Sequence, residues 1–176
     1  LDRMKKRLES SKDGSDSGYF VDLLLYGELV TKIVSLYMVS AVNEDTERSQ
    51  YRLKYNLVRA NAVGDFSKAI EETVIGPPAQ LLSSTIRDKE FKELTQRASS
   101  NDWQYEAQKL VVECLEIFNI PHDKLPVKSP LRNWFQNFTV LRNKTKGHGA
   151  PVISSCAEAS PKLERAIELI VSNFSA

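Results

Sequence analysis

Cysteine and histidine are scarce in this sequence of 176 residues, which holds two of each. The cysteines, Cys114 and Cys156, form no C-x-x-C pair. A zinc site and a disulfide framework are therefore not expected, and no metal or other cofactor is predicted. A reduced protein of the cytoplasm is the simplest interpretation.

Long uninterrupted apolar runs are also missing. The most apolar stretch, residues 19–42, is broken by Asp22, Glu28 and Lys32, which favours a buried core helix over a membrane span. No signal-peptide pattern is visible. The chain begins with Leu1 and not with methionine, as a domain excised from a longer protein would.

A strong charge of either sign is absent, since the formal net charge is +1. Nucleic acid would therefore have to bind to a local patch and not to a whole-molecule field. Apolar residues at 41% and charged residues at 27% are ordinary values for a globular protein. We expect a charged helix and linker over residues 1–18 and one helical domain over residues 19–176.

The apolar periodicity is helical almost throughout, without a convincing strand, hairpin or internal repeat. The sequence therefore predicts an all-α bundle. The expected later helices are one over about 46–60, one capped by Asp65 and ending at Gly76-Pro77-Pro78, one over 84–97, one capped by Asp102 and ending at Asn119-Ile120-Pro121, and a last one starting at Ser160-Pro161.

The clearest helical stripe consists of Leu131, Trp134, Phe135, Phe138 and Leu141, and the helix closes near Gly147. Arg142 follows Phe138 by four residues, so it shares this inward-facing stripe. A buried arginine needs a carboxylate, a carbonyl or a phosphate as its partner. The alternative is an arginine that bonds the last carbonyls of its helix.

Acidic residues are missing from the whole stretch Lys124–Ala157. This stretch carries only bases, namely Lys124, Lys128, Arg132, Arg142, Lys144 and Lys146. Solvated loop lysines would give the same pattern. An anionic ligand is the other explanation, because the bases surround the one segment that joins an arginine to a histidine.

His148 lies between Gly147 and Gly149. Glycines allow the backbone to come close to a ligand, and an imidazole titrates near neutral pH, as general acid–base catalysis requires. An exposed loop histidine is the alternative. His122 has no arginine or glycine beside it and is interpreted as a surface residue. The G-x-S-x-G, H-E-x-x-H, P-loop and G-x-G-x-x-G patterns are absent.

Arg142-Asn143, followed by four residues and His148 at the end of an aromatic helix, resembles the HEPN superfamily. The signature of that family is an arginine, a gap of four to six residues and a histidine, often with a polar residue directly after the arginine. Here the gap is five residues and Asn143 takes the polar position. The resemblance extends over about residues 20–175 and implies a HEPN-like bundle with additional helices over about 64–97.

The resemblance implies a metal-independent endoribonuclease that leaves a 2′,3′-cyclic phosphate. His148 would be the acid–base group, Arg142 would stabilise the transition state, and Asn143 would orient the histidine or bind phosphate. Lys144 and Lys146, with Arg132, would hold the RNA backbone. The family implies a homodimer, and a role as an effector of a bacterial toxin or antiphage system with an antitoxin or sensor as partner.

Two questions stay open at the level of the sequence. The family often carries an acidic residue on an early helix that faces the site, and Glu28 or Asp22 matches it by position, although an ion pair of Glu28 with Lys32 explains Glu28 equally well. The alternative function is a catalytically inactive helical module for dimerisation or for binding a partner or nucleic acid.

Overall fold

The computed structural model describes residues 1–146 and 152–174. Helices dominate this part of the chain, so the predicted all-α class is confirmed. The helices are α1 (Asp2–Lys12), α2 (Asp16–Ser40), α3 (Ser49–Val58), α4 (Val63–Ile75), the 3-10 helix η1 (Pro77–Leu81), α5 (Ser84–Asp88), α6 (Glu90–Thr95), α7 (Trp103–Ile117), α8 (Arg132–Lys146) and α9 (Ile153–Asn173).

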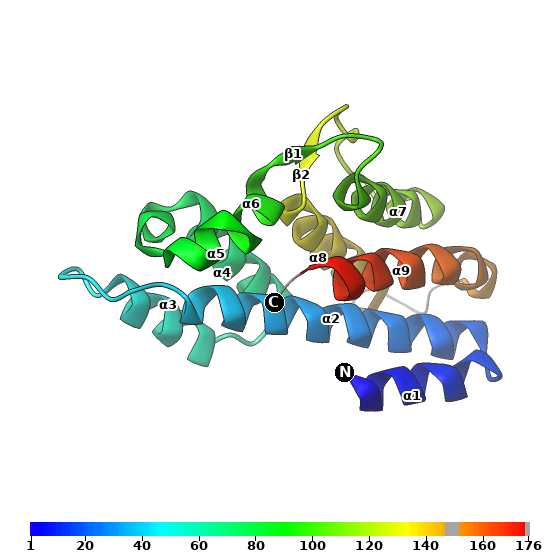
Figure 1. Ribbon diagram of the computed structural model, residues 1–176. Coiled ribbons are helices and arrows are strands. Elements are labelled where there is room, and N and C mark those ends of the chain that lie inside the picture. Colours follow the sequence, from blue (N-terminus) through cyan, green and yellow to red (C-terminus); the bar gives the residue numbers. More distant parts are fainter. Residues whose placement is uncertain (147–151, 175–176) are drawn as a thin grey trace.

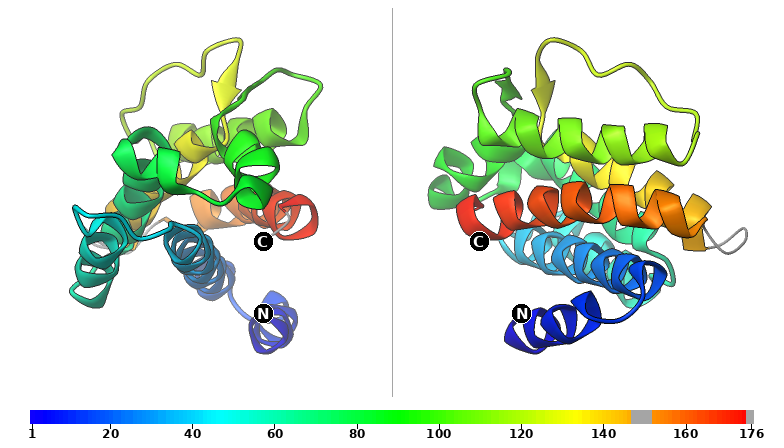
Figure 2. Two further views of the ribbon diagram at one scale, coloured as in Figure 1. Left: turned by 60° about the vertical axis from the view of Figure 1, so that its left-hand side comes forward. Right: turned by 90° about the vertical axis from the view of Figure 1, so that its right-hand side faces the viewer.

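The long helices form the body of the molecule. In the right-hand view of Figure 2, α7, α9, α2 and α1 follow one another as layers. Helix α8 packs against α7 and α4, and α4 packs against α2 (Figure 1). The largest fully buried side chains include Trp134, Phe135 and Phe138 of α8 and Phe20 of α2, so the aromatic stripe predicted for α8 is the centre of the core.

Helix α2 is long and apolar enough to cross a membrane by length and composition alone. It runs, however, through the middle of the bundle, and about half of its residues are buried against other helices. The charges that interrupt it, Asp22, Glu28 and Lys32, are all in ion pairs. These observations favour the predicted buried core helix.

The N-terminal segment has a shorter linker than predicted, because α2 already begins at Asp16. Ser15 caps α2 by accepting a hydrogen bond from the Gly18 amide at 3.1 Å. Helix α1 lies along α2 through the buried Leu8 and is tied by two ion pairs, Arg7–Asp22 at 2.7 Å and Lys12–Glu164 at 2.6 Å.

Two helix starts were predicted wrongly. Asp65 is not an N-cap: α4 begins at Val63, and the Asp65 carboxylate accepts the amides of Asn61 and Ala62 from inside the first turn. Ser160-Pro161 does not begin the last helix either, because α9 starts at Ile153 and contains Pro161. The Ser160 hydroxyl instead donates to the carbonyl of Cys156 at 2.8 Å.

Two further differences concern the middle of the chain. The expected helix over 84–97 is two short helices, α5 and α6, which meet at Lys89. Strands β1 (Arg97–Ala98) and β2 (Ser129–Pro130), which were not predicted, pair in antiparallel fashion and connect the loop before α7 to the loop before α8. Two-residue strands carry no alternation that a sequence pattern could reveal.

The ring of Phe138 on α8 packs directly against α2 at Gly27. A Cβ atom added at Gly27 would stand 2.4 Å from Cε2 of Phe138, well inside van der Waals contact. Phe138 cannot easily move away, since it is fully buried and stacks on Trp134 with ring centroids 5.0 Å apart. The missing side chain at Gly27 therefore makes room for the ring of Phe138.

We predict that Gly27→Ala lowers the free energy of unfolding by about 1–3 kcal/mol, because overpacking outweighs the better helix propensity of alanine. Urea unfolding followed by circular dichroism measures the change. Gly64→Ala is the matched control: its added Cβ would lie 3.4 Å from Cγ2 of Thr139, an ordinary contact, and stability should be unchanged or slightly higher. Equal effects of both substitutions would contradict the steric argument.

Candidate functional site around Arg142

Arg142 lies near the C-terminal end of α8, directly after the buried Leu141. Its side chain is 23% exposed, which places it at the border of the aromatic stripe. The α-helical period that buries Phe135 and Phe138 also turns Arg142 toward α2. The sequence prediction that this arginine faces inward is confirmed, and its partner is a carboxylate.

Glu28 of α2 is that partner. Nε and Nη2 of Arg142 donate to the same carboxylate oxygen, Oε2 of Glu28, at 3.2 and 3.1 Å. Nη1 donates to Oδ1 of Asn143 at 3.3 Å. Within the described residues, no hydrogen bond joins this guanidinium to the last carbonyls of α8, so the simple C-terminal capping role does not describe Arg142.

Glu28 is also paired with Lys32, whose Nζ lies 2.9 Å from Oε1. Burial raises the pKa of Glu28, but the hydrogen bonds and charges of Lys32 and Arg142 outweigh this effect and leave the pKa below its ordinary value. The carboxylate is therefore ionised at neutral pH. Lys32 in turn lies 5.5 Å from the ring centroid of Phe66 on α4.

The geometry distinguishes between the two acidic candidates. Glu28 contacts Arg142, whereas Asp22 bonds to Arg7 of α1 at 2.7 Å. The ion pair of Glu28 with Lys32 exists as well, so this carboxylate binds two cations at once. Proximity to Arg142 could not be predicted, because it depends on how α8 packs against α2 in the folded bundle.

The other predicted site residues are only partly brought together. Asn143, Lys144 and Lys146 are exposed at the end of α8. Lys146 borders an open hollow of about 790 Å³ between the end of α8 and the start of α2, with Arg7 and Asp22 on its far side. His148, the predicted acid–base group, lies outside the described residues.

Arg132 does not join this group. It is the first residue of α8, about 15 Å along the helix from Arg142 at the ordinary helical rise. It is half-buried, and burial, with a smaller effect of the nearby Arg97, lowers its pKa. A role of Arg132 in holding the same phosphates as Lys144 and Lys146 would need an RNA that extends along α8.

His122 is more firmly held than a surface residue. Its Nδ1 lies 2.9 Å from the carbonyl oxygen of Ile120, and its ring is 18% exposed. The turn at Asn119, which has a positive φ of 51°, folds this segment back on the end of α7. His122 is therefore a loop residue, as predicted, whose ring is held in place at the surface.

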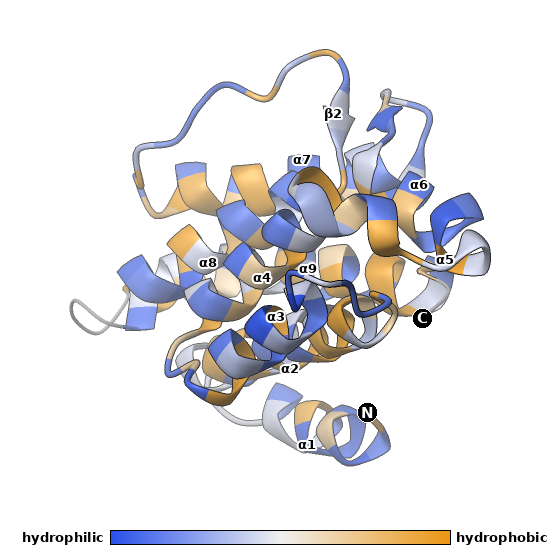
Figure 3. Ribbon diagram, turned by 90° about the vertical axis from the view of Figure 1, so that its left-hand side faces the viewer, coloured by the Kyte–Doolittle hydropathy of each residue, from blue (hydrophilic) through white to orange (hydrophobic). Residues whose placement is uncertain are grey.

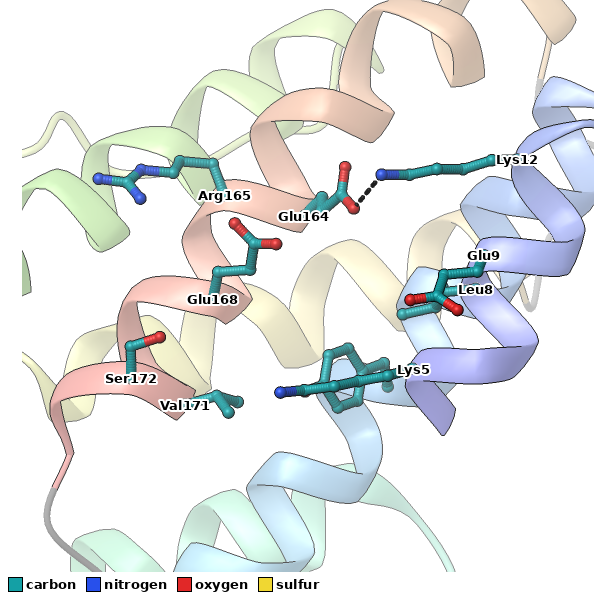
Figure 4. A pocket seen from close by; sticks show the side chains of 10 residues that line it. Lys5, Leu8, Glu9, Lys12, Glu164, Arg165, Glu168, Val171 and Ser172 are labelled. Atoms are coloured by element: carbon teal, nitrogen blue, oxygen red, sulfur yellow. Dashed lines mark ion pairs between the residues drawn. The ribbon is translucent and has the colours of Figure 1, made fainter. Parts of the chain in front are cut away.

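A second cavity, of about 460 Å³, lies between α1 and α9 (Figure 4). Both signs of charge line it: Lys5, Lys12 and Arg165 face Glu9, Glu164 and Glu168. Lys12 and Glu164 pair across it, as the dashed line in Figure 4 marks. Burial is the main reason that the pKa of the neighbouring Tyr19 is raised to about 12, and the nearby carboxylate of Glu164 adds to this effect. We interpret this cavity as an ion-paired seam that attaches α1.

Among residues 1–146 and 152–174, no group of three or more histidine, cysteine, aspartate and glutamate side chains is placed to hold a metal ion. Comparison of the chain with protein-family models, with curated proteins and with solved structures finds no match.

We predict that Glu28→Gln lowers the free energy of unfolding by about 1–3 kcal/mol at neutral pH, because it removes a charged acceptor from two cations. The folded-state pKa of Glu28 lies below its ordinary value of 4.5. The stabilisation is therefore complete above pH 4.5 and disappears as the pH falls through the lower, folded-state pKa. Urea unfolding of the parent and the variant at pH values from about 2.5 to 7 measures this difference in the free energy of unfolding.

The matched control is Asp88→Asn, which breaks the exposed Lys92–Asp88 pair. Exposed pairs contribute about 0–1 kcal/mol, so this variant should differ little from the parent at any pH. A Glu28→Gln variant that is as stable as the parent at pH 7, or a difference that grows toward low pH, would contradict the assignment.

Proposed function

We propose that this chain is a HEPN-type endoribonuclease domain that cleaves RNA without a metal ion and leaves a 2′,3′-cyclic phosphate. The observation that carries the proposal is the placement of Arg142. A partly exposed guanidinium is held by Glu28 and Asn143 at the end of α8, six positions before His148 in the chain.

A guanidinium has five N–H donors. The bonds to Glu28 and Asn143 engage three of them, so donors are left for a phosphate oxygen. Glu28 fixes the plane of the group, and a fixed donor stabilises developing charge better than a mobile one. Lys144 and Lys146 are exposed beside it, without an ion pair in the described part of the chain, and supply positive charge for the RNA backbone.

In the proposed reaction, the ribose 2′-oxygen bonds to the adjacent phosphorus as His148 takes its proton. Negative charge builds up on the non-bridging oxygens, where Arg142 donates hydrogen bonds. The bond from phosphorus to the 5′-oxygen then breaks, and that oxygen takes up a proton to leave as a hydroxyl. In a homodimer the second copy of His148 would be the acid that delivers this proton.

The resemblance to the HEPN superfamily also suggests the biological setting. We propose a cytoplasmic homodimer that acts as the effector of a bacterial toxin–antitoxin or antiphage system, with an antitoxin or a sensor as its regulatory partner. Two copies of the Arg142–His148 segment would then face each other across the dimer.

One observation favours the alternative function, a catalytically inactive helical module. Glu28 accepts two bonds from Arg142, and an ion pair between two core helices is by itself a sufficient reason for an arginine at this position. The alternative predicts dimerisation or binding without turnover.

RNA cleavage in the presence of EDTA distinguishes the two functions. We expect the parent to yield fragments with 2′,3′-cyclic phosphate ends, and His148→Ala and Arg142→Ala each to lose about 100-fold or more in kcat/KM, as removal of an acid–base or charge-stabilising group does. Arg165→Ala is the control, since this exposed arginine of α9 pairs with Glu106. The variant should cleave RNA like the parent.

Rates are compared per folded protein, because Arg142→Ala also removes the ion pair with Glu28. No cleavage by the parent dimer, or unaltered cleavage in both site variants, would remove the support for an enzyme and leave the binding module.

A further inference from the structure

The outer face of α3 carries aromatic and basic side chains that the folded core does not use. Leu53 anchors α3 to the body and is 2% exposed. On the opposite side, Tyr51 is 56% exposed and Tyr55 is 48% exposed. The two tyrosines are four residues apart, so they lie on the same side of the helix, and that side faces solvent.

The two tyrosines form an ordered row with two arginines. Their rings are 6.3 Å apart between centroids and inclined by 23°, in a stacked arrangement. The guanidinium of Arg48 lies 6.0 Å from the ring centroid of Tyr51, and that of Arg59 lies 5.4 Å from the ring centroid of Tyr55. Nη1 of Arg59 also donates to the Tyr55 hydroxyl at 2.7 Å. The row thus presents two flat rings between two cations.

The charge of this segment is one-sided. From Arg48 to Gly64 there is no acidic residue, and the bases are Arg48, Arg52, Lys54 and Arg59. None of these four forms an ion pair within the described residues. The outer face of α3 is therefore positive.

Three of the four acidic residues that flank the segment bond backbone or hydroxyl groups, and the fourth, Glu47, directly precedes Arg48. Glu44 accepts the amides of Gln50 and Tyr51, and Asp45 accepts the amide and hydroxyl of Ser49. The backbone bond from Ser49 is the main reason that the pKa of Asp45 is lowered. At the other end, Asp65 accepts the amides that precede α4. These carboxylates fix the ends of α3 and α4 and do not neutralise the row.

Helix stability is a weak explanation for the row. Exposed aromatic and cation–π pairs at this spacing stabilise a helix only slightly, while both rings stay in contact with water. Aromatic side chains beside arginines that form no ion pair are, by contrast, the elements with which proteins hold single-stranded nucleic acid. Every nucleobase has a face that stacks, and the arginines bind the phosphates.

We propose that the row Arg48–Tyr51–Tyr55–Arg59 is a binding platform for single-stranded nucleic acid, and for RNA if the proposed function holds. Bases stack on Tyr51 and Tyr55. The basic side chains of Arg48, Arg52, Lys54 and Arg59 hold the phosphates. A hollow of about 310 Å³ between α3 and α4, lined by Tyr55, Arg59 and Lys68 together with Asp65 and Glu72, offers a place for an uncharged base beside Tyr55.

The platform is connected to the Arg142 site through α4. Three residues separate Arg59 from the start of α4 at Val63. Phe66, in the first turns of α4, contacts Lys32, which pairs with Glu28, the partner of Arg142. Figure 3 looks onto α3 with α4 and α8 beside it. A strand held on α3 can therefore reach Arg142 over the start of α4.

The test is fluorescence anisotropy with a labelled single-stranded DNA oligonucleotide, which lacks the 2′-hydroxyl and cannot be cleaved by the proposed reaction, and with an RNA of the same sequence. We expect the double variant Tyr51→Ala/Tyr55→Ala to raise Kd by about 10- to 100-fold for both strands, since each stacked base contributes strongly to binding. Tyr51→Phe/Tyr55→Phe keeps both rings and should bind within about threefold of the parent.

Val58→Ala is the matched control, because Val58 is 86% exposed on the same helix but is not aromatic; its Kd should not change. Arg48→Gln and Arg59→Gln should each reduce the slope of log Kd against log salt by about 0.7. Circular dichroism of every variant checks that it folds. Substitutions at these solvent-exposed positions should leave the fold intact.

The outcomes separate this platform from the proposed function. DNA binding that depends on the tyrosines supports the platform even if RNA is never cut. Binding that is absent in the parent, or equal in the parent and in the double alanine variant, overturns it even if RNA is cut. Self-association that is lost in the double alanine variant while oligonucleotide binding is kept also overturns it, in favour of a protein interface.

Discussion

The packing of the Phe138 ring against Gly27 of α2 is the contact on which the candidate site depends. Any side chain at that position would meet the ring of Phe138, which is fully buried. Gly27 leaves room for this ring, and the aromatic side chains of α8 are fully buried in the bundle. The same contact brings Arg142 within hydrogen-bond distance of Glu28, one residue after Gly27. Packing and the candidate site are thus two consequences of one contact.

The electrostatics around Arg142 follow from its place at the border of the core. A carboxylate that is shared by Lys32 and Arg142 stays ionised and leaves the three groups with one net positive charge. The guanidinium keeps free donors and a fixed plane, both of which suit a phosphate ligand. The basic row on α3 is a second positive surface, and α4, which carries Phe66 beside Lys32, packs against α3.

Those features that depend on local periodicity could be predicted from the sequence. The stripe Trp134, Phe135 and Phe138, the helical class and the need of Arg142 for a partner follow from spacing and residue type. Which helix supplies the partner depends on tertiary contact, and Glu28 could not be preferred over Asp22. The start of α9 was predicted wrongly at Ser160-Pro161, because proline is common in the first turn of a helix and rare in its interior. In the structure Pro161 lies inside α9. The exposure of the tyrosines on α3 could not be predicted either, since an aromatic side of a helix is more often buried.

The central claim is that Glu28 and Arg142 act as a pair that joins α2 to the end of α8. A double-mutant cycle tests it most directly, with Glu28→Gln, Arg142→Gln and the double variant compared by urea unfolding at pH 7. The account predicts a coupling free energy of about 1–3 kcal/mol, as for charged groups in direct contact. Effects that add to within about 0.3 kcal/mol would contradict it, because independent sites behave in that way.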